Sequence, residues 1–377
     1  MNKKYNIAFI HLDDLHHINH FITIAIELSK SHNVSILTYP LKHEYLINKL
    51  QELNGDLVKV EPLKTLKFRG FTDKIKKRSF PRKGFWMKKN KDYLLTFDAI
   101  FLTDFIQEYL LKFRKERKKP VLIRIYHGFT GRSYSYKKEL LDFDVHLLPG
   151  NYAYKEFEKR GLLKHTKIIG YPKLEAITIA ENKNTFKKDQ VTILYNPHFS
   201  PPFSSWDKFG LKVLEYFYKS DQYNLIFAPH INLFAEKGGE LNEKIPKKYF
   251  ESENIYIDLG STKSVEMIYP NQADIYLGDV SSQVYEYIIS PRPCIFINIQ
   301  NTDYQYNEDF RFWRCGEVIN SIDQLNDALE NASTNFKESY KKIQKEINLG
   351  NLLIDKNESP SKKAAIVIEE YLENIDK

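Results

Sequence analysis

The sequence predicts an α/β protein made of two Rossmann-like, doubly wound domains that face each other across a cleft. Three observations predict this class. Apolar runs of strand length alternate with helical patterns along most of the 377 residues, which favours parallel sheets covered by helices on both faces. The chain is longer than a single core of about 150 residues requires. A polar stretch at residues 176–190 interrupts the alternation and indicates a linker.

The N-terminal domain, residues 1–175, shows the alternation most clearly. "YNIAFIHL" is a buried-strand pattern, "NHFITIAIELSKSH" has helical spacing, and "NVSILTYP" is the next strand. Further strands are expected in "DYLLTFDAIFLTDF", "PVLIRIYHG" and "FDVHLLPG". Strands separated by helices predict a parallel sheet.

The C-terminal domain, residues 191–350, repeats the pattern, and residues 351–377 are expected to form a helical segment. Its strands are predicted in "VTILYNPHF", "YNLIFAPH", "NIYIDLG", "ADIYLGD" and "PCIFINI". Ser361 is a candidate N-cap for the last helix. Neither domain contains GxGxxG, so a nicotinamide dinucleotide site is not supported.

The composition excludes several protein classes. The hydrophobic content of 42% and the charged content of 28% are ordinary for a globular protein. Two cysteines, Cys294 and Cys315, make neither a disulfide framework nor a zinc-ligand spacing. No apolar run approaches the roughly 18 residues of a membrane span, and the first 20 residues do not resemble a signal peptide. A cytoplasmic protein is expected.

The segment 64–91 holds twelve Lys or Arg residues against one acid, Asp73, with aromatic residues interleaved. A solvated basic loop is one interpretation. Contact with an anionic membrane or an anionic acceptor is the second. Nucleic acid is the third, and it is not expected because no nucleic-acid module occurs elsewhere. The residues assigned to membrane or acceptor contact are Lys76, Lys77, Arg78, Arg82, Lys83 and Trp86.

Histidines stand at the ends of three predicted strands. His127 ends "VLIRIYHG", His198 follows "VTILYNP", and His230 ends "YNLIFAPH". A single histidine in such a position is more often structural than catalytic. Several at the edge where ligands bind favour general-base and anion-binding roles, because imidazole serves both near neutral pH.

A fourth strand end carries Asp279, Ser281 and Ser282 just before a predicted helix. One serine there caps the helix. The pair, together with the positive end of the helix, can also bind phosphate. Glu286 lies one turn further on, where a carboxylate accepts hydrogen bonds from ribose hydroxyls or is simply solvated.

Residues 121–310 resemble the CDP-glycerol glycerophosphotransferase family of teichoic-acid and capsule synthesis, a GT-B-like group. The resemblance rests on ordered motifs: "YHGFTGRSYSYKK", "GYPKLEA", "ILYNPHF", "FAPH", "LGDVSSQVYEYIISPRPCIF" and "NTDYQYNEDFRFW". The chain departs from the family pattern at Phe129-Thr130-Gly131, Lys173, Val280 and Glu286.

The resemblance implies transfer of an alditol phosphate from a CDP-activated donor to a hydroxyl of a lipid-linked or polymeric acceptor. It implies His127 as the base and His230 as a second catalytic group that stabilises phosphate charge. The donor phosphates would contact Ser281, Ser282, Asp279 and Gly128, and the nucleotide would contact Glu286, Pro197 and His198.

No cofactor and no metal are expected. The adjacent carboxylates of "LDD" at 12–14 are interpreted as a surface loop. The enzyme is expected at the inner face of the cell membrane as a peripheral protein. Two alternatives stay open: a glycosyltransferase that uses a UDP-sugar or CMP-Kdo, and a scaffold protein that holds an anionic polymer without turnover.

Overall fold

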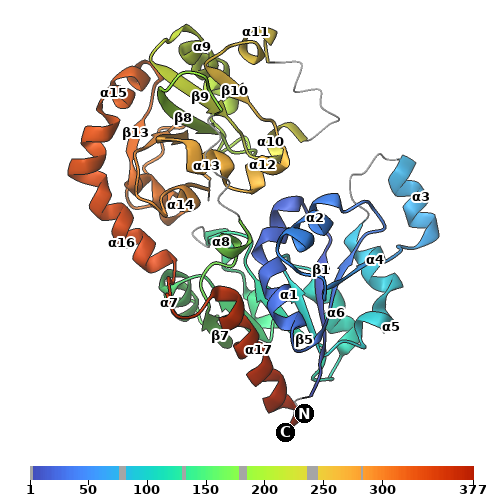
Figure 1. Cartoon of the computed structure of the whole chain (residues 1–377). Helices are drawn as coiled ribbons and strands as arrows, with labels where there is room; N and C mark the ends of the chain where they lie inside the picture. Colours follow the sequence, from blue (N-terminus) through green and yellow to red (C-terminus); the bar gives the residue numbers. More distant parts are fainter. Residues whose placement is uncertain (1–2, 76–81, 130–132, 178–184, 236–244, 282) are drawn as a thin grey trace. The chain divides into compact units, whose positions relative to one another are not determined.

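The computed structural model describes residues 3–75, 82–129, 133–177, 185–235, 245–281 and 283–377. The chain divides into two compact units, shown in Figure 1. Unit 1 contains residues 1–130, 134–177 and 350–377, and unit 2 contains residues 131–133 and 178–349. Each unit has one parallel sheet with helices on its faces, so the predicted α/β class is confirmed.

In its described part, unit 1 has a seven-stranded parallel sheet in the order β3-β2-β1-β4-β5-β6-β7. The strand order reverses between β1 and β4, and open α/β sheets bind ligands beyond the carboxyl ends of such strands. The strands are β1 (Asn6–His11), β2 (Asn33–Thr38), β3 (Lys59–Pro62), β4 (Ala99–Leu102), β5 (Val121–Ile125), β6 (Val145–Leu148) and β7 (His165–Ile168).

Helices cover both faces of this sheet. They are α1 (Ile22–Ser29), α2 (Glu44–Glu52), α3 (Lys67–Ile75), α4 (Lys83–Lys89), α5 (Lys91–Leu94), α6 (Gln107–Arg114), α7 (Asn151–Lys159), α8 (Lys173–Ala176) and α17 (Pro360–Asp376). Short 3₁₀ turns occur at Leu15–His20, Ser133–Ser135 and Lys138–Asp142.

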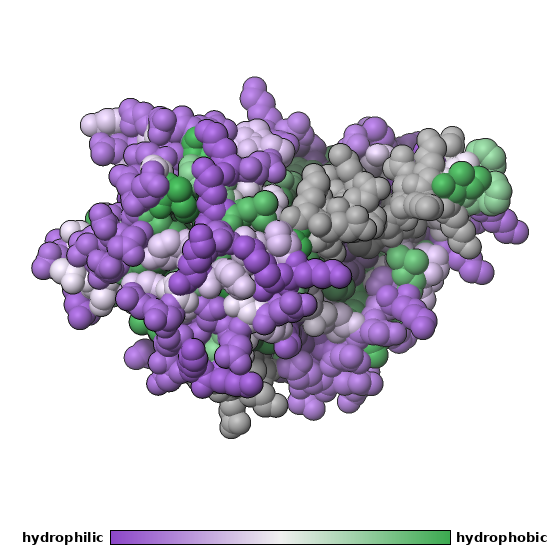
Figure 2. Space-filling view, turned by 90° about the horizontal axis from the view of Figure 1, so that it is seen from above, coloured by the Kyte–Doolittle hydropathy of each residue, from purple (hydrophilic) through white to green (hydrophobic). Residues whose placement is uncertain are grey.

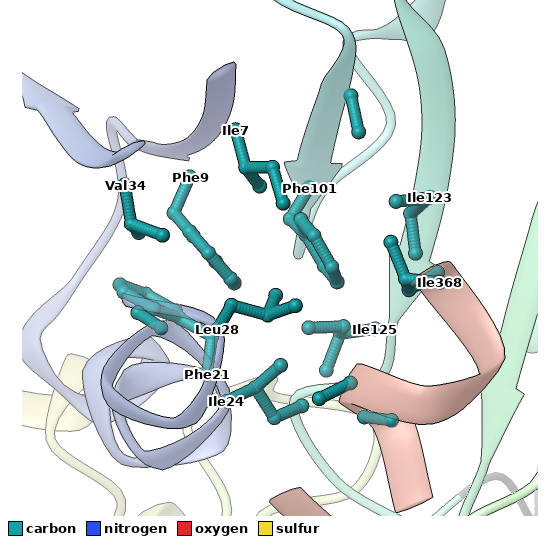
Figure 3. Close-up of a cluster of buried hydrophobic side chains, with 14 of the residues drawn as sticks. Ile7, Phe9, Phe21, Ile24, Leu28, Val34, Phe101, Ile123, Ile125 and Ile368 are labelled. Carbon is teal, nitrogen blue, oxygen red and sulfur yellow. The ribbon is translucent and has the colours of Figure 1, made fainter. Parts of the chain in front are cut away.

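The alternation along β1 divides the core of unit 1. Ile7 and Phe9 belong to the cluster that includes α1 and α17, which Figure 3 shows in close-up. Ala8 and Ile10 belong to the opposite cluster, which includes residues of α4, α5 and α6. Successive strand residues point to opposite faces, so a strand buried on both faces is apolar throughout.

The last helix, α17, packs on unit 1, and Ile368 reaches the side chains of β5 in Figure 3. Its N-cap is Ser359, whose hydroxyl accepts the N–H of Lys362 at 3.3 Å, and Pro360 follows in the first turn. The prediction of Ser361 as the cap is therefore wrong. Ser361 is buried and donates instead to Glu175 at 3.2 Å.

Unit 2 repeats the design with a six-stranded parallel sheet in its described part, in the order β10-β9-β8-β11-β12-β13. The strand order reverses between β8 and β11. The strands are β8 (Val191–Asn196), β9 (Tyr223–Phe227), β10 (Ile255–Ile257), β11 (Ile275–Gly278), β12 (Cys294–Ile297) and β13 (Glu317–Ile319).

The helices of unit 2 are mostly short. They are α9 (Leu211–Lys219), α10 (Asn232–Ala235), α11 (Lys247–Phe250), α12 (Thr262–Val265), α13 (Ile268–Gln272), α14 (Gln283–Tyr287), α15 (Leu325–Asn335) and α16 (Lys341–Asn351). The core includes Trp206 stacked on Phe227 at 5.0 Å between ring centroids. Throughout the described ranges, no helix combines the length and apolarity needed to cross a bilayer.

Candidate active site

In unit 1, the chain segments that follow β1, β4 and β5 bring polar side chains to one edge of the sheet. Thr103 follows β4 and contacts two histidines. Its backbone oxygen lies 2.8 Å from Nδ1 of His127, and its hydroxyl lies 2.9 Å from Nδ1 of His17. The strand-end position predicted for His127 is thus beside the point where the strand order reverses.

The contact with Thr103 determines which ring nitrogen of His127 carries hydrogen. A carbonyl oxygen only accepts hydrogen bonds, so Nδ1 of His127 must be the donor. In the neutral ring, Nε2 then holds a lone pair. Desolvation by the surrounding protein, followed by the positive charge of Arg124, lowers the pKa of His127 to about 4. The residue still keeps exposed surface, so it is a neutral and accessible base near pH 7.

Arg124 is the buried cation of this region. It is 3% exposed, and its guanidinium carbon lies 4.5 Å from the ring centroid of Phe105 and 5.3 Å from that of Tyr126. Its Nε and Nη1 have no hydrogen-bond partner within the described ranges. Aromatic faces stabilise the buried charge, and that charge disfavours a second positive charge on His127.

His16, His17 and His127 form a group whose ligand atoms all lie within 4.8 Å of one another, as a metal site would require. The rings of His17 and His127 are stacked, with centroids 4.1 Å apart and planes 22° apart. A metal ion lies in the plane of each imidazole that binds it, and two stacked planes do not meet at one ion. The stacking therefore fits orientation of the His127 ring better than metal binding.

Lys83, at the start of α4, joins the segments that follow β1 and β4. Its ammonium group pairs with Asp13 and, at 2.5 Å, with Asp104. Desolvation opposes the charge of Lys83, but the two carboxylates outweigh it and raise the pKa of the ammonium group. Lys83, which was assigned to membrane or acceptor contact, thus bridges two carboxylates. Asp13 is half-buried and takes part in this ion pair, so it is not simply a solvated residue of a surface loop.

In unit 2, Asp279 follows β11 and connects it to the segment after β8. The carboxylate accepts the backbone N–H of His198 at 2.8 Å and that of Ser205 at 2.5 Å. Asp279 is fully buried. The structure therefore does not support a direct contact of Asp279 with donor phosphates, because the side chain is fully buried and its two oxygens already accept backbone N–H groups.

His198 and His230 lie together at this edge, with ring centroids 5.7 Å apart. Nδ1 of His198 accepts the N–H of Ser200 at 3.0 Å, and Nδ1 of His230 accepts the N–H of Asn232 at 3.2 Å. An accepting Nδ1 carries no hydrogen, so each neutral ring has its hydrogen on Nε2. Both rings are thus N–H donors of the kind that binds phosphate oxygens, opposite in tautomer to His127.

The remaining residues predicted for the donor site have mixed positions. Ser281 is buried, and its hydroxyl accepts the N–H of Gln283 at 3.3 Å, which is a helix-cap contact. Glu286 is also buried, on α14, and is not a solvated helix residue. Pro197 is buried beside His198, and Gly128 follows His127. Ser282 lies outside the described residues.

The basic segment is only partly described, and Lys76, Lys77 and Arg78 lie outside the described residues. Arg82 donates to the hydroxyl of Thr72 at 3.1 Å and lies over the ring of Phe85. Trp86 is fully buried, and its indole N–H donates to the oxygen of Leu63 at 2.9 Å. The assignment of Trp86 to a membrane or acceptor surface is therefore wrong, because the ring is part of the core.

Sequence reasoning missed two polar residues that hold these loops. Thr103 orients His127, and its signal was its position directly after the strand "AIFL". Asp258 follows β10 and accepts the N–H groups of Gly260 at 3.0 Å and Ser261 at 2.7 Å. Each lies just beyond the carboxyl end of a strand in its own sheet, as the histidines of that sheet do. Any polar residue in such a position is a candidate for a role in ligand binding.

Comparison with known proteins gives one family and several solved structures with a similar fold. The family model described as CDP-Glycerol:Poly(glycerophosphate) glycerophosphotransferase matches residues 157–360, just over half of the chain and without His127. A comparison with curated proteins finds no significant match.

Solved structures similar to this chain include the wall teichoic acid polymerase TagF, with a TM-score of 0.63 and 13% identity over 99% of this chain and 89% of that one. MnaA from S. aureus, solved with UDP, has a TM-score of 0.61 and 12% identity over 99% and 98%. The calicheamicin glycosyltransferase CalG4 has a TM-score of 0.58 and 13% identity over all of both chains. Identities this low show the fold alone, and that fold is the predicted GT-B-like one.

The position of Asp279 predicts an unusual pH dependence of stability. Burial raises the pKa of Asp279 to about 7, although backbone N–H donors oppose the shift; in the unfolded chain the pKa is about 3.9. The folded state therefore binds the proton more tightly, and this contribution to stability is full below pH 4 and is lost as the pH rises through 7.

Asp279→Asn removes that titration. The free energy of unfolding of the wild type minus that of the variant should fall between pH 4 and pH 7, by at most about 1.4 kcal/mol per pH unit. Hydrogen exchange of unit 2 amides, read by mass spectrometry, measures it, with Asp207→Asn as an exposed control in the same unit. A difference that stays constant or grows with pH would contradict a raised pKa of Asp279 in the folded state and would show that the backbone N–H donors outweigh burial.

Proposed function

The chain belongs to the CDP-glycerol:poly(glycerophosphate) glycerophosphotransferase family, and on that premise we propose how its residues divide the reaction. The enzyme is a transferase that moves glycerol phosphate from a CDP-activated donor to a polymer acceptor in cell-wall polymer synthesis. The glycosyl-transfer alternative, with a UDP-sugar or CMP-Kdo as donor, is disfavoured because the family transfers a phosphoryl group. The scaffold alternative is disfavoured for the same reason.

The reaction needs a base and a group that binds anionic oxygens. An acceptor hydroxyl attacks the β-phosphorus of the donor, a new P–O bond forms, and the bond to the CMP oxygen breaks. The hydroxyl proton must leave the acceptor, and CMP leaves with the negative charge. Little covalent chemistry falls to the protein, so positioning and charge stabilisation account for most of the catalysis.

We assign the base to His127 in unit 1. Its Nδ1 is engaged by Thr103, its Nε2 holds the lone pair, and its pKa of about 4 keeps the ring neutral at working pH. Its tautomer is the single observation that carries the assignment, because the opposite tautomer would present a hydrogen where the acceptor proton must go. The stacked His17 holds the ring plane in place.

We assign the donor phosphates to His198 and His230 in unit 2. Each ring has Nδ1 occupied by a backbone N–H and so presents Nε2–H as a donor. Such donors stabilise the charge that develops on phosphate oxygens. Asp279 does not contact the phosphates itself in this proposal; it positions His198 by accepting the backbone N–H of that residue. Ser282, Glu286 and Gly128 keep their proposed contacts with the donor.

One substitution made at two histidines separates these roles. A glutamine amide can replace an Nε2–H donor but cannot take a proton. His127→Gln should therefore lower kcat by about 10²–10⁴. His230→Gln should stay within about tenfold of the wild type, while His230→Ala should lose about 10²–10³. CMP release from CDP-glycerol with a polymer acceptor measures the rate.

His165→Gln is the matched control, since His165 begins β7, at the end of the strand opposite the carboxyl ends where the candidate site lies, and the replacement should leave kcat unchanged. Thermal melts of every variant exclude unfolding as the cause. Near-normal turnover by His127→Gln would remove His127 from the mechanism. Equal losses in His230→Gln and His230→Ala would show that the Nε2–H donor is not what His230 supplies.

We further propose that the enzyme works at the inner face of the cell membrane, bound through the region around α3. Phe68, Phe71 and Ile75 occupy one face of α3 and are 68%, 64% and 64% exposed. Figure 2 shows exposed hydrophobic side chains on the right, over the position of α3 in Figure 1. An apolar helix face within a basic segment suits insertion into an anionic interface.

Removal of this apolar face should weaken binding to membranes. Phe68→Ser/Phe71→Ser should reduce sedimentation with anionic vesicles by about tenfold or more, because each ring buries apolar area in the interface. Leu57→Ser/Leu349→Ser, which removes two exposed leucines elsewhere, is the control and should sediment like the wild type. Binding by the wild type should also weaken as salt rises. Equal sedimentation of the two double variants would rule out α3 as the anchor.

A further inference from the structure

Unit 1 contains a hollow of about 770 Å³ lined by residues of α4, α5 and α6. His127 and Thr103 are not among its lining residues, although Lys83 belongs to both regions. Its volume is in the range of small-ligand sites. The lining residues are Arg82, Lys83, Gly84, Phe85, Lys88, Lys91, Tyr109, Lys112 and Phe113. Cations and aromatic rings make up nearly all of this lining, and none of the residues is acidic.

The charge of the hollow is not cancelled by its surroundings. Lys83 is paired with Asp13 and Asp104, and Lys112 is 3.4 Å from Glu108. Lys88 and Lys91, both exposed, have no ion pair among the residues that the structure describes. Two ammonium groups are therefore available at the rim, and the hollow favours an anion.

The aromatic side chains form an apolar wall beside these charges. The guanidinium carbon of Arg82 lies 4.9 Å from the ring centroid of Phe85. Tyr109 packs so closely on Gly84 that a Cβ there would lie 2.9 Å from the phenol ring. A ligand with an anionic group and an apolar part meets both kinds of surface in this hollow.

One hydrogen bond links the lining of the hollow to α3. Arg82, which lines the hollow, donates to the hydroxyl of Thr72 on α3. Phe71 and Ile75 on that helix are exposed. A charged hollow next to an exposed apolar helix is the arrangement that an amphiphile requires, with its headgroup at the cations and its chains along the helix.

We propose that this hollow binds the phosphate headgroup of an anionic phospholipid whose acyl chains lie against α3. Lys88 and Lys91 contact the phosphate oxygens, and the ring of Phe85 contacts the glycerol backbone. The site is a specific headgroup pocket and not only a diffuse attraction. This inference rests on the membrane contact proposed above, and it is independent of the roles given to His127 and His230.

A short-chain phosphatidylglycerol, kept below its critical micelle concentration, tests the pocket without a bilayer. Its affinity for the full chain is measured by isothermal titration calorimetry. Lys88→Gln/Lys91→Gln should weaken binding at least tenfold. Lys4→Gln/Lys118→Gln removes two exposed positive charges elsewhere in unit 1 and should change the affinity less than twofold.

Two further ligands distinguish the sources of the phosphate. Short-chain phosphatidylcholine should bind at least tenfold more weakly than phosphatidylglycerol, and equal binding would overturn an anionic headgroup site. Free glycerol phosphate lacks acyl chains and should also bind at least tenfold more weakly. If it bound as well as the lipid, the pocket would serve a soluble or polymeric phosphate and the lipid proposal would be overturned.

Turnover of the wild type on a water-soluble acceptor without lipid is measured alongside. If the wild type is active but binds no phosphatidylglycerol, the headgroup site is overturned. The same holds if Lys88→Gln/Lys91→Gln and Lys4→Gln/Lys118→Gln bind phosphatidylglycerol with equal affinity. A protein that binds phosphatidylglycerol in the expected order but shows no transfer would support the pocket and count against the catalytic roles.

Discussion

The candidate site depends most on the hydrogen bond from Nδ1 of His127 to the backbone oxygen of Thr103. A carbonyl oxygen accepts but does not donate, so this one contact puts the hydrogen on Nδ1 and the lone pair on Nε2. The nearby residues support the same state. Desolvation, followed by the charge of Arg124, disfavours protonation of the His127 ring, and His17 stacks on that ring. The pair Asp13 and Asp104, joined through Lys83, ties the segments on either side of the point where the sheet order reverses.

Unit 2 also has histidines at its sheet edge, but their Nδ1 atoms contact backbone N–H groups and not a backbone oxygen. Backbone N–H groups donate to Nδ1 of His198 and His230, so these rings present N–H where His127 presents a lone pair. The buried carboxylate of Asp279 holds the backbone that positions His198. The roles proposed above follow these main-chain contacts, with proton acceptance at one sheet and anion binding at the other. A phosphoryl transfer needs both functions, and a change of partner at Nδ1 would exchange them.

The fold and the positions of the three histidines could be predicted from the sequence. Parallel strands buried on both faces are apolar throughout, so the two sheets and the strand-end positions of His127, His198 and His230 follow from hydrophobic patterns. The family resemblance agrees with the matched model, and the family, fold and reaction class were all predicted correctly. Tautomers were not predictable, because they depend on contacts such as that of His127 with Thr103, 24 residues away.

Other predictions from the sequence were wrong for identifiable physical reasons. The aromatic and basic residues of 64–91 were treated as one surface, but Trp86 lies on the buried face of α4, and a seven-residue helix is too short for its pattern to show this. Asp279 stands where a ligand contact is expected, yet a carboxylate serves equally well as a backbone clamp. Ser359 and Ser361 are both reasonable caps by sequence, and only the position of Pro360 in the first turn favours the former.

The most direct test of this account is the tautomeric state of the three histidines. Two-dimensional ¹H–¹⁵N spectra of protein labelled in its histidine rings, assigned with His127→Gln, His198→Gln and His230→Gln, report which nitrogen carries hydrogen at pH 7. The account predicts a neutral Nδ1–H ring for His127 and neutral Nε2–H rings for His198 and His230. A His127 ring that is protonated at Nε2, or that has the same tautomer as the other two, would contradict the division of base and anion-binding roles.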